Sequence, residues 1–321
     1  MSVNIRKIII YAAAFMSLLI LFPLNAYAAP ELMPDGQYFD ADYYAEHNPD
    51  VKKVCGTSKE RLYAHYLEFG HAEGRDPFDP ELLNDPEALM IPGANLAPID
   101  PMDAFTLKGY FSRSVFIGDS IMVGYHNHLA YLKDSNMSGA QFLAKVSYSA
   151  VHANNETDKL HPAFMGVSQP VWESIAMMPV DRVFIMFGTN DLVSFSPEQT
   201  VERVSMLVDK IKAKCPYIDI NIISMTPVYA GTNKGFLANP FIAQYDQLMA
   251  VRCAERGWGF VNLLPAMSDE SGNIRADYSS DKYVHLTNKA YSEVWDLALQ
   301  NHALSQIGEK ARVEVRGPAL Q

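Results

Sequence analysis

Three short runs, far apart in the chain, together contain the side chains that acyl transfer requires. The first run is Val115–Ser120 and ends in Gly-Asp-Ser, and the second is Val183–Asp191 and ends in Gly-Thr-Asn-Asp. The third run, Asp281–Thr287, contains an aspartate and a histidine. A serine nucleophile, an asparagine that donates to an oxyanion, a histidine base and a carboxylate that orients it are the groups that acyl transfer uses.

The first two runs also have the composition of buried parallel strands. Both are apolar, rich in β-branched and aromatic residues, and end in glycine followed by polar residues. Open α/β sheets bind ligands at the edge where such strands end. Ser120 also opens a helical stretch, whose N-terminal field favours a developing alkoxide. We expect Asp119 to accept backbone N–H bonds and so to fix the turn before the serine.

Strand and helix patterns alternate along the chain around these runs, from about residue 109 to residue 302. The strand candidates are 114–118, 141–146, 182–187, 219–225 and 258–263. The helical patterns lie near 121–133, 170–178, 197–214, 240–256 and 288–303. Such alternation predicts an α/β fold, a three-layer α/β/α sandwich around a five-stranded parallel sheet. Right-handed crossovers then bring the three runs to one edge of that sheet.

Taken together, the three runs resemble the SGNH, or GDSL-type, serine hydrolase family over residues 112–303. The resemblance implies a flavodoxin-like fold and esterase activity, with Ser120 as nucleophile, His285 as base and Asp281 as the residue that orients it. It also implies an oxyanion hole made by Asn190 and by backbone N–H groups, one of them that of Ser120.

Two features depart from the family pattern. The family carries a glycine after its second strand, whereas Lys145–Ala150 contains none, and we expect Ser147 to take that position with its backbone N–H. The family also spaces its aspartate and histidine as Asp-x-x-His, whereas Asp281 and His285 have one more residue between them. Asp277 is the reserve orienter, and a Ser120–His285 dyad remains if neither aspartate reaches.

Four further residues are candidates for lining the substrate side, because they follow strand ends or lie in loops: Tyr125, His152, Trp172 and Tyr229. Ordinary packing is the alternative for each of them. The nine histidines and three cysteines show no metal-ligand spacing, so we expect neither a metal nor another cofactor. A net charge of −11 argues against nucleic acid as a partner.

The N-terminus has the pattern of a secretory signal peptide over residues 1–28. Arg6 and Lys7 precede an apolar run over 8–24, and Ala-Tyr-Ala at 26–28 offers small residues for cleavage after Ala28. We therefore expect a secreted or extracytoplasmic protein. The alternative is an uncleaved membrane anchor.

The rest of the chain divides by composition into an N-terminal module, a linker, a hydrolase domain and a tail. Residues 36–78 are dense in aromatics and predict a small module with helices at about 40–47 and 58–69, the second capped by Gly70. The module resembles one found beside catalytic domains in secreted bacterial proteins, which leaves two interpretations, cell-surface attachment and a simple helical cap. The remaining boundaries are a proline-rich linker at 79–108, the hydrolase domain at 109–304 and a C-terminal tail at 305–321.

Two functional hypotheses follow from the sequence. The leading one is a secreted serine esterase that hydrolyses ester groups, O-acetyl groups above all, on extracellular or cell-wall carbohydrate such as an O-acylated polysaccharide. The rival is a weakly active or non-catalytic extracellular binding or attachment protein on the same fold, suggested by the missing glycine and the longer Asp–His spacing. Reaction of Ser120 with a fluorophosphonate would distinguish them.

Overall fold

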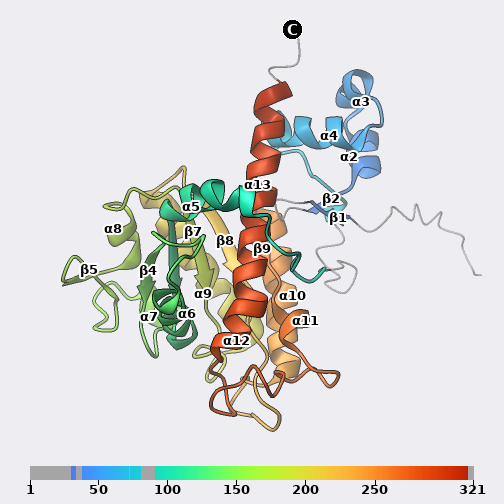
Figure 1. The fold of residues 1–321 in the computed structure, drawn as a ribbon. Helices are drawn as coiled ribbons and strands as arrows, with labels where there is room; N and C mark the ends of the chain where they lie inside the picture. The colour runs from blue at the N-terminus through green and yellow to red at the C-terminus, as the bar shows by residue number, and fades with distance from the viewer. Residues whose placement is uncertain (1–29, 34–37, 72, 81–90, 317–321) are drawn as a thin grey trace, which may run out of the picture.

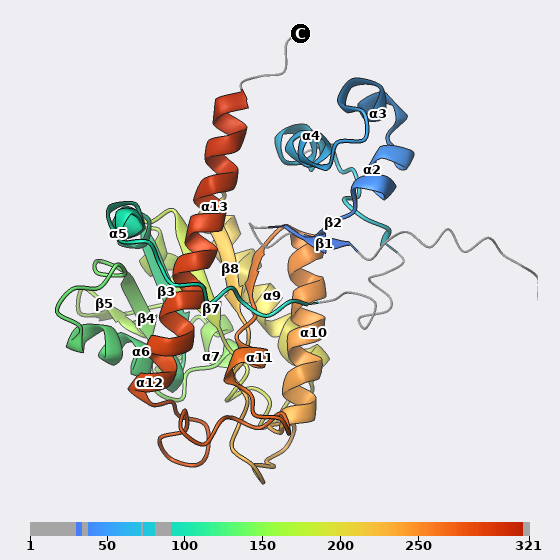
Figure 2. The same cartoon turned by 45° about the vertical axis from the view of Figure 1, so that its right-hand side comes forward.

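A computed structural model describes residues 30–33, 38–71, 73–80 and 91–316, and the predicted signal peptide lies outside these residues. The centre of the molecule is a parallel sheet in the order β4-β3-β7-β8-β9 (Figures 1 and 2). The strands are β3 (Ser114–Gly118), β4 (Gln141–Ala144), β7 (Arg182–Met186), β8 (Asp219–Ile223) and β9 (Gly259–Val261). The predicted five-stranded parallel sheet is confirmed, and β4, β8 and β9 end two residues before their predicted limits.

Helices cover both faces of this sheet, which gives the predicted three layers. One face packs against α7 (Ala150–Asn154), α8 (Val171–Ile175), α9 (Pro197–Lys214) and α10 (Asn239–Arg256). The other packs against α5 (Ala104–Ser112), α6 (Ser120–Tyr131) and α13 (Asp296–Arg316). Short elements complete the domain: hairpin strands β5 (Ala163–Phe164) and β6 (Val167–Ser168), α11 (Leu264–Met267), α12 (Asn288–Ala290) and a π-helical turn (Tyr291–Trp295).

The alternation of side chains along each strand builds two separate cores. Val115 and Ile117 of β3 pack into the core beneath α9 and α10. Phe116 points to the opposite face, where its ring stacks on that of Phe184 in β7 at a centroid distance of 4.7 Å. The central strands β3 and β7 are buried on both faces and therefore need apolar residues at nearly every position, which explains their continuous apolar runs. The edge strand β4 is only partly buried.

The N-terminal module contains one helix more than the sequence predicts. Strands β1 (Glu31–Leu32) and β2 (Tyr38–Phe39) precede α2 (Ala41–His47), α3 (Pro49–Cys55) and α4 (Lys59–His65), and a π-helical turn ends at Gly70. The missed helix, α3, begins at Pro49, a residue favoured at the first position of a helix. The module has its own aromatic core, and Tyr38 and Phe78 join it to Val251 and Ala254 of α10.

Two predicted boundaries differ from the structure. The described second half of the linker, from residue 91, lies on the hydrolase domain: the Ala94 N–H donates to the Asn262 carbonyl at 2.8 Å, and Leu107 in α5 is fully buried. The tail predicted from residue 305 is helical as far as Arg316, as the continuation of α13 (Figure 1). Within the residues that the structure describes, no helix is long and apolar enough to cross a membrane.

The turn between β3 and α6 leaves no room for a side chain at Gly118. A Cβ atom there would lie 2.8 Å from the Met122 Cβ and 2.9 Å from the Met186 carbonyl oxygen. We predict that Gly118→Ala lowers the free energy of unfolding by about 1–3 kcal/mol, the usual cost of overpacking. Urea denaturation measures this, with Gly109→Ala as control because nothing lies within 4 Å of its Cβ position. Equal stability of Gly118→Ala and wild type would contradict the packing argument.

Candidate active site

Ser120 stands at the start of α6, directly after the strand that delivers it. Asp119 caps this helix, because its Oδ1 accepts the Ile121 N–H at 2.8 Å, as the sequence predicts. Ser120 is half-buried, whereas Asp119 is almost completely buried. The capped helix start therefore holds the serine hydroxyl at the carboxyl-terminal edge of the sheet.

His285 and Asp281 extend from Ser120 as a continuous chain of hydrogen bonds. The distance from His285 Nε2 to Ser120 Oγ is 3.0 Å, and His285 Nδ1 lies 2.6 Å from Asp281 Oδ2. Since a carboxylate only accepts, Nδ1 carries the ring proton and Nε2 accepts from the serine hydroxyl. The His285 side chain is 45% exposed, so the chain of bonds is open to solvent on one side.

The extra residue between Asp281 and His285 is accommodated by a left-handed backbone at Lys282, whose φ is 55°. The turn that results lets Asp281 Oδ1 accept the N–H groups of Tyr283 at 2.8 Å and His285 at 3.2 Å. Burial raises the pKa of Asp281, but the hydrogen bonds from the His285 ring and these two N–H groups outweigh it and lower the pKa below its usual value. Asp281 therefore stays ionised beside the imidazole.

The reserve orienter, Asp277, does not contact the histidine. Its carboxylate pairs with Lys289 at 2.7 Å and with Arg275 at 3.1 Å. Hydrogen bonds from these two cations lower the pKa of Asp277 to about 2. The structure thus brings Asp281, and not Asp277, to His285.

Asn190 and Asp191 attach the turn after β4 to the end of β7. The Asn190 amide donates to the Tyr148 carbonyl at 3.0 Å and, more distantly, to Asp119 Oδ2 at 3.4 Å. The buried Asp191 carboxylate accepts the N–H groups of Ala150 and Val151, both at 3.2 Å, at the start of α7. The sequence analysis quoted Asp191 in its motif without giving it a role, and its partners lie forty residues away in the chain.

Ser147 lies in this turn, at the position where the family pattern has a glycine. Its φ is 62°, a left-handed conformation that glycine adopts freely and other residues rarely adopt. The turn is closed by the Tyr148 N–H, which donates to the Lys145 carbonyl at 3.1 Å. Ser147 thus adopts the left-handed backbone conformation for which the family pattern has a glycine at this position.

Two of the four predicted substrate-lining residues belong to the core instead. Tyr125 is fully buried in α6, and its hydroxyl donates to Asp296 Oδ1 at 2.7 Å. Trp172 is 7% exposed and packs beneath the sheet, with the Lys210 ammonium 4.8 Å from its ring centroid. Tyr125 and Trp172 therefore serve ordinary packing, which was the alternative interpretation of both residues.

The other two predicted lining residues are partly accessible. His152 lies in α7, and its Nδ1 is 2.7 Å from the hydroxyl of Ser149, the residue that caps this helix. Tyr229 follows β8, and its N–H donates at 2.8 Å to the Tyr283 carbonyl in the loop that carries His285. Among the described residues, no group of three or more His, Cys, Asp or Glu side chains could hold a metal ion.

A hydrogen-bonded serine, histidine and aspartate beside an asparagine amide, on a parallel sheet covered on both faces, is the arrangement typical of serine acyl hydrolases. The family model of the GDSL-like Lipase/Acylhydrolase family matches residues 116–292, more than half of the chain. The chain therefore belongs to this family of ester hydrolases. A search of curated proteins gave no match.

Solved structures share the fold at low sequence identity. A GDSL-like lipase from Bacteroides thetaiotaomicron is 17% identical over 72% of this chain and 97% of its own, with a TM-score of 0.46. A protein described as an acylhydrolase from Bacteroides fragilis is 18% identical over 68% and 92%, with a TM-score of 0.45. A carbohydrate esterase family 3 protein from Talaromyces cellulolyticus is 13% identical over 64% of this chain and 99% of its own, with a TM-score of 0.39.

Burial raises the pKa of Asp119 to about 6, although hydrogen bonds from the Ile121 N–H and the Thr189 side chain oppose the shift. The native state thus holds this proton more tightly than the unfolded chain does. We predict that wild-type stability, relative to Asp119→Asn, falls as the pH rises from about 4 to about 6 and then stays level, by on the order of 3 kcal/mol in total.

Urea denaturation of both proteins at several pH values measures this difference. Asp277→Asn is a control for which the pH dependence of stability should have the opposite sign. Because the pKa of Asp277 is lowered to about 2, wild-type stability relative to that variant should rise with pH, and only below about pH 4. If the stabilities of wild type and Asp119→Asn changed with pH in parallel, the raised pKa assigned to Asp119 would be wrong.

Proposed function

We propose that this protein is a secreted serine esterase that removes acyl groups, acetyl above all, from extracellular or cell-wall carbohydrate. The observation that carries the proposal is the hydrogen-bonded chain from Ser120 through His285 to Asp281. In this proposal Ser120 is the nucleophile, His285 the general base and Asp281 the carboxylate that orients the imidazole.

The reaction proceeds through an acyl-enzyme. Ser120 Oγ attacks the ester carbonyl carbon while His285 Nε2 accepts the hydroxyl proton, and Asp281 stabilises the imidazolium that forms. The tetrahedral intermediate collapses, the C–O bond to the alcohol breaks, and His285 returns its proton to the departing alkoxide. Water, deprotonated by the same imidazole, then attacks the acyl-enzyme, which releases the carboxylic acid and restores Ser120.

Three groups are proposed to hold the oxyanion: the Ser120 N–H, the Ser147 N–H and the Asn190 amide. One Asn190 N–H bonds the Tyr148 carbonyl at 3.0 Å, whereas the contact with Asp119 at 3.4 Å is long. An oxyanion is a stronger acceptor, so it can replace that second partner during the reaction. Loss of one oxyanion donor costs about 3–4 kcal/mol of transition-state stabilisation.

Location and accessory structure support the extracellular carbohydrate part of the proposal. The signal-like segment at residues 1–28 favours export, and the module within 36–78 folds around a core of its own. In this proposal the module attaches the enzyme to the cell surface. The open active site, with His285 45% exposed, suits an ester on a large substrate that cannot enter a deep pocket.

Ser120→Ala tests the nucleophile. We expect this variant to lose hydrolysis of p-nitrophenyl acetate and covalent labelling by a fluorophosphonate, because no other group replaces the attacking oxygen. Circular dichroism and the unfolding midpoint should stay close to those of wild type, since the hydroxyl is half-buried and bonds only the exposed imidazole. Activity retained by the variant would reject the assignment. A wild type that neither hydrolyses nor is labelled would favour the non-catalytic alternative.

Asp281→Asn tests the orienting carboxylate against a matched control in the same loop. We expect kcat to fall by roughly 10²- to 10⁴-fold, because an amide no longer holds the productive tautomer. Asp277→Asn should leave kcat within a few-fold of wild type, because Asp277 pairs with Arg275 and Lys289. Steady-state kinetics on p-nitrophenyl acetate measures both. The reverse ranking would exchange the two roles.

A further inference from the structure

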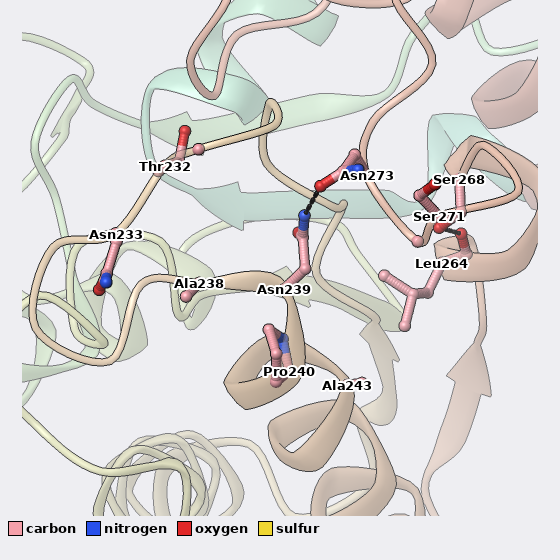
Figure 3. Close-up of a pocket in the computed structure, with 12 residues that line it drawn as sticks. Thr232, Asn233, Ala238, Asn239, Pro240, Ala243, Leu264, Ser268, Ser271 and Asn273 are labelled. Carbon is pink, nitrogen blue, oxygen red and sulfur yellow. Dashed lines mark hydrogen bonds between the residues drawn. The ribbon is translucent and has the colours of Figure 1, made fainter.

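A cavity lies at the same edge of the sheet as the candidate active site, beyond the ends of β8 and β9. Its volume is about 670 Å³, within the range of about 300–1,000 Å³ typical of small-molecule sites. Figure 3 shows Thr232 and Asn233 on one side of it, Ser271 and Asn273 on the other, and the start of α10 between them.

The lining of this cavity is uncharged and combines polar with apolar residues. It consists of Asn, Ser, Thr and Gly residues together with Ala238, Pro240, Ala243 and Leu264. Among the described residues, no hydrogen-bond partner is found for the hydroxyls of Thr232 and Ser271, the Asn233 side chain or the Asn273 amide nitrogen. The cavity therefore presents hydrogen-bond donors and acceptors from both sides and an apolar surface at its base.

Hydrogen bonds hold both walls of the cavity in place. Asn239 holds the first wall, because its Oδ1 accepts the Val228 N–H at 2.8 Å and its Nδ2 donates to Asn273 at 2.9 Å. The Asp269 carboxylate holds the second, because it accepts the N–H groups of Ser271 at 2.9 Å and Asn273 at 3.0 Å. Preformed walls reduce the entropy that a ligand must lose on binding.

The wall that carries Thr232 and Asn233 is also bonded to both candidate catalytic loops. Before these residues, the Tyr229 N–H donates to Tyr283 at 2.8 Å, two residues from His285. After them, the Phe236 N–H donates to Leu192 at 2.7 Å, two residues from Asn190. This loop therefore connects one wall of the cavity to the loops that carry His285 and Asn190.

We propose that this cavity is a subsite for an uncharged sugar residue next to the acylated one. The inference rests on the proposed esterase function and names its substrate class. Free hydroxyl and amide groups match the hydroxyls of a sugar, and the apolar base matches the C–H face of its ring. An acidic sugar fits less well, since the lining has no cation and the Asp269 carboxylate lies behind the wall.

The start of α10 does not change this assignment. Pro240 has no N–H, and the N–H groups of Phe241 and Ile242 both donate to the Ala238 carbonyl at 3.0 Å. This helix end thus offers few free donors to an anion. A fatty acyl chain is also a poor match, because it would bury the unpaired polar groups without replacing their hydrogen bonds with water.

Calorimetry on Ser120→Ala protein separates sugar binding from hydrolysis. The ligands are the unacylated neutral tetraoses of xylose, glucose and N-acetylglucosamine, with tetragalacturonate as the acidic comparison. We expect at least one neutral tetraose to bind more tightly than the acidic one. Thr232→Val with Asn233→Leu, and separately Ser271→Ala, should weaken that binding by about tenfold, the effect of about 1.4 kcal/mol in lost hydrogen bonds. Thr106→Val, at an exposed position of α5, is the matched control and should bind as the parent does.

Kinetics provides the second measurement. Two substrates are compared, the O-acetylated form of the bound tetraose and p-nitrophenyl acetate. In the cavity variants, kcat/KM on the first relative to kcat/KM on the second should fall by about tenfold, because KM for the acetylated tetraose rises. Three outcomes overturn the subsite: no neutral tetraose binds, the acidic one binds best, or the cavity variants bind as the parent does. A wild type inactive on every ester while neutral sugar binding depends on the cavity would reject the esterase proposal and leave the cavity assignment standing.

Discussion

The direct parallel pairing of β3 with β7 is the constraint on which the site depends. Gly118 and Met186 are partners in this register, so Ser120 and Asn190 emerge side by side from adjacent strands. Gly118 makes this approach possible, because a side chain there would meet the Met186 carbonyl. The serine and the amide are therefore placed by two adjacent inner strands of the sheet, and the surrounding loops bring the remaining groups to them.

The loops do so by bonding buried polar groups to backbone, at the cost of two unusual conformations. Asp119 and Asp191 are both buried and both accept N–H groups at helix starts, so each carboxylate holds one loop in place. Ser147 and Lys282 adopt left-handed backbone without being glycine, and both lie at the candidate site. Such residues cost of order 1–3 kcal/mol and persist where the surrounding structure determines their conformation. At Lys282, the left-handed turn accommodates the extra residue between Asp281 and His285. At Ser147, it gives the backbone conformation that glycine adopts freely.

The segment after β8 extends the site away from the serine. It is hydrogen-bonded to the loops of His285 and Asn190, and it forms one wall of the uncharged cavity. Backbone hydrogen bonds therefore connect this segment to the loops that carry His285 and Asn190. The His285 side chain itself is 45% exposed.

The sequence by itself determined the sheet, most of its covering helices and the identity of the candidate site residues. Strands buried on both faces require unbroken apolar runs, and α9 begins with Ser196 and Pro197 in a capping box, so these signals are local. The tertiary structure alone decided which aspartate meets His285, because the left-handed turn at Lys282 that brings Asp281 to the imidazole is not predicted by the local sequence. It also decided that Tyr125 and Trp172 are core residues and that residues from 91 pack on the domain. Those outcomes depend on contacts between segments distant in the chain, such as Tyr125 with Asp296, which no local pattern encodes.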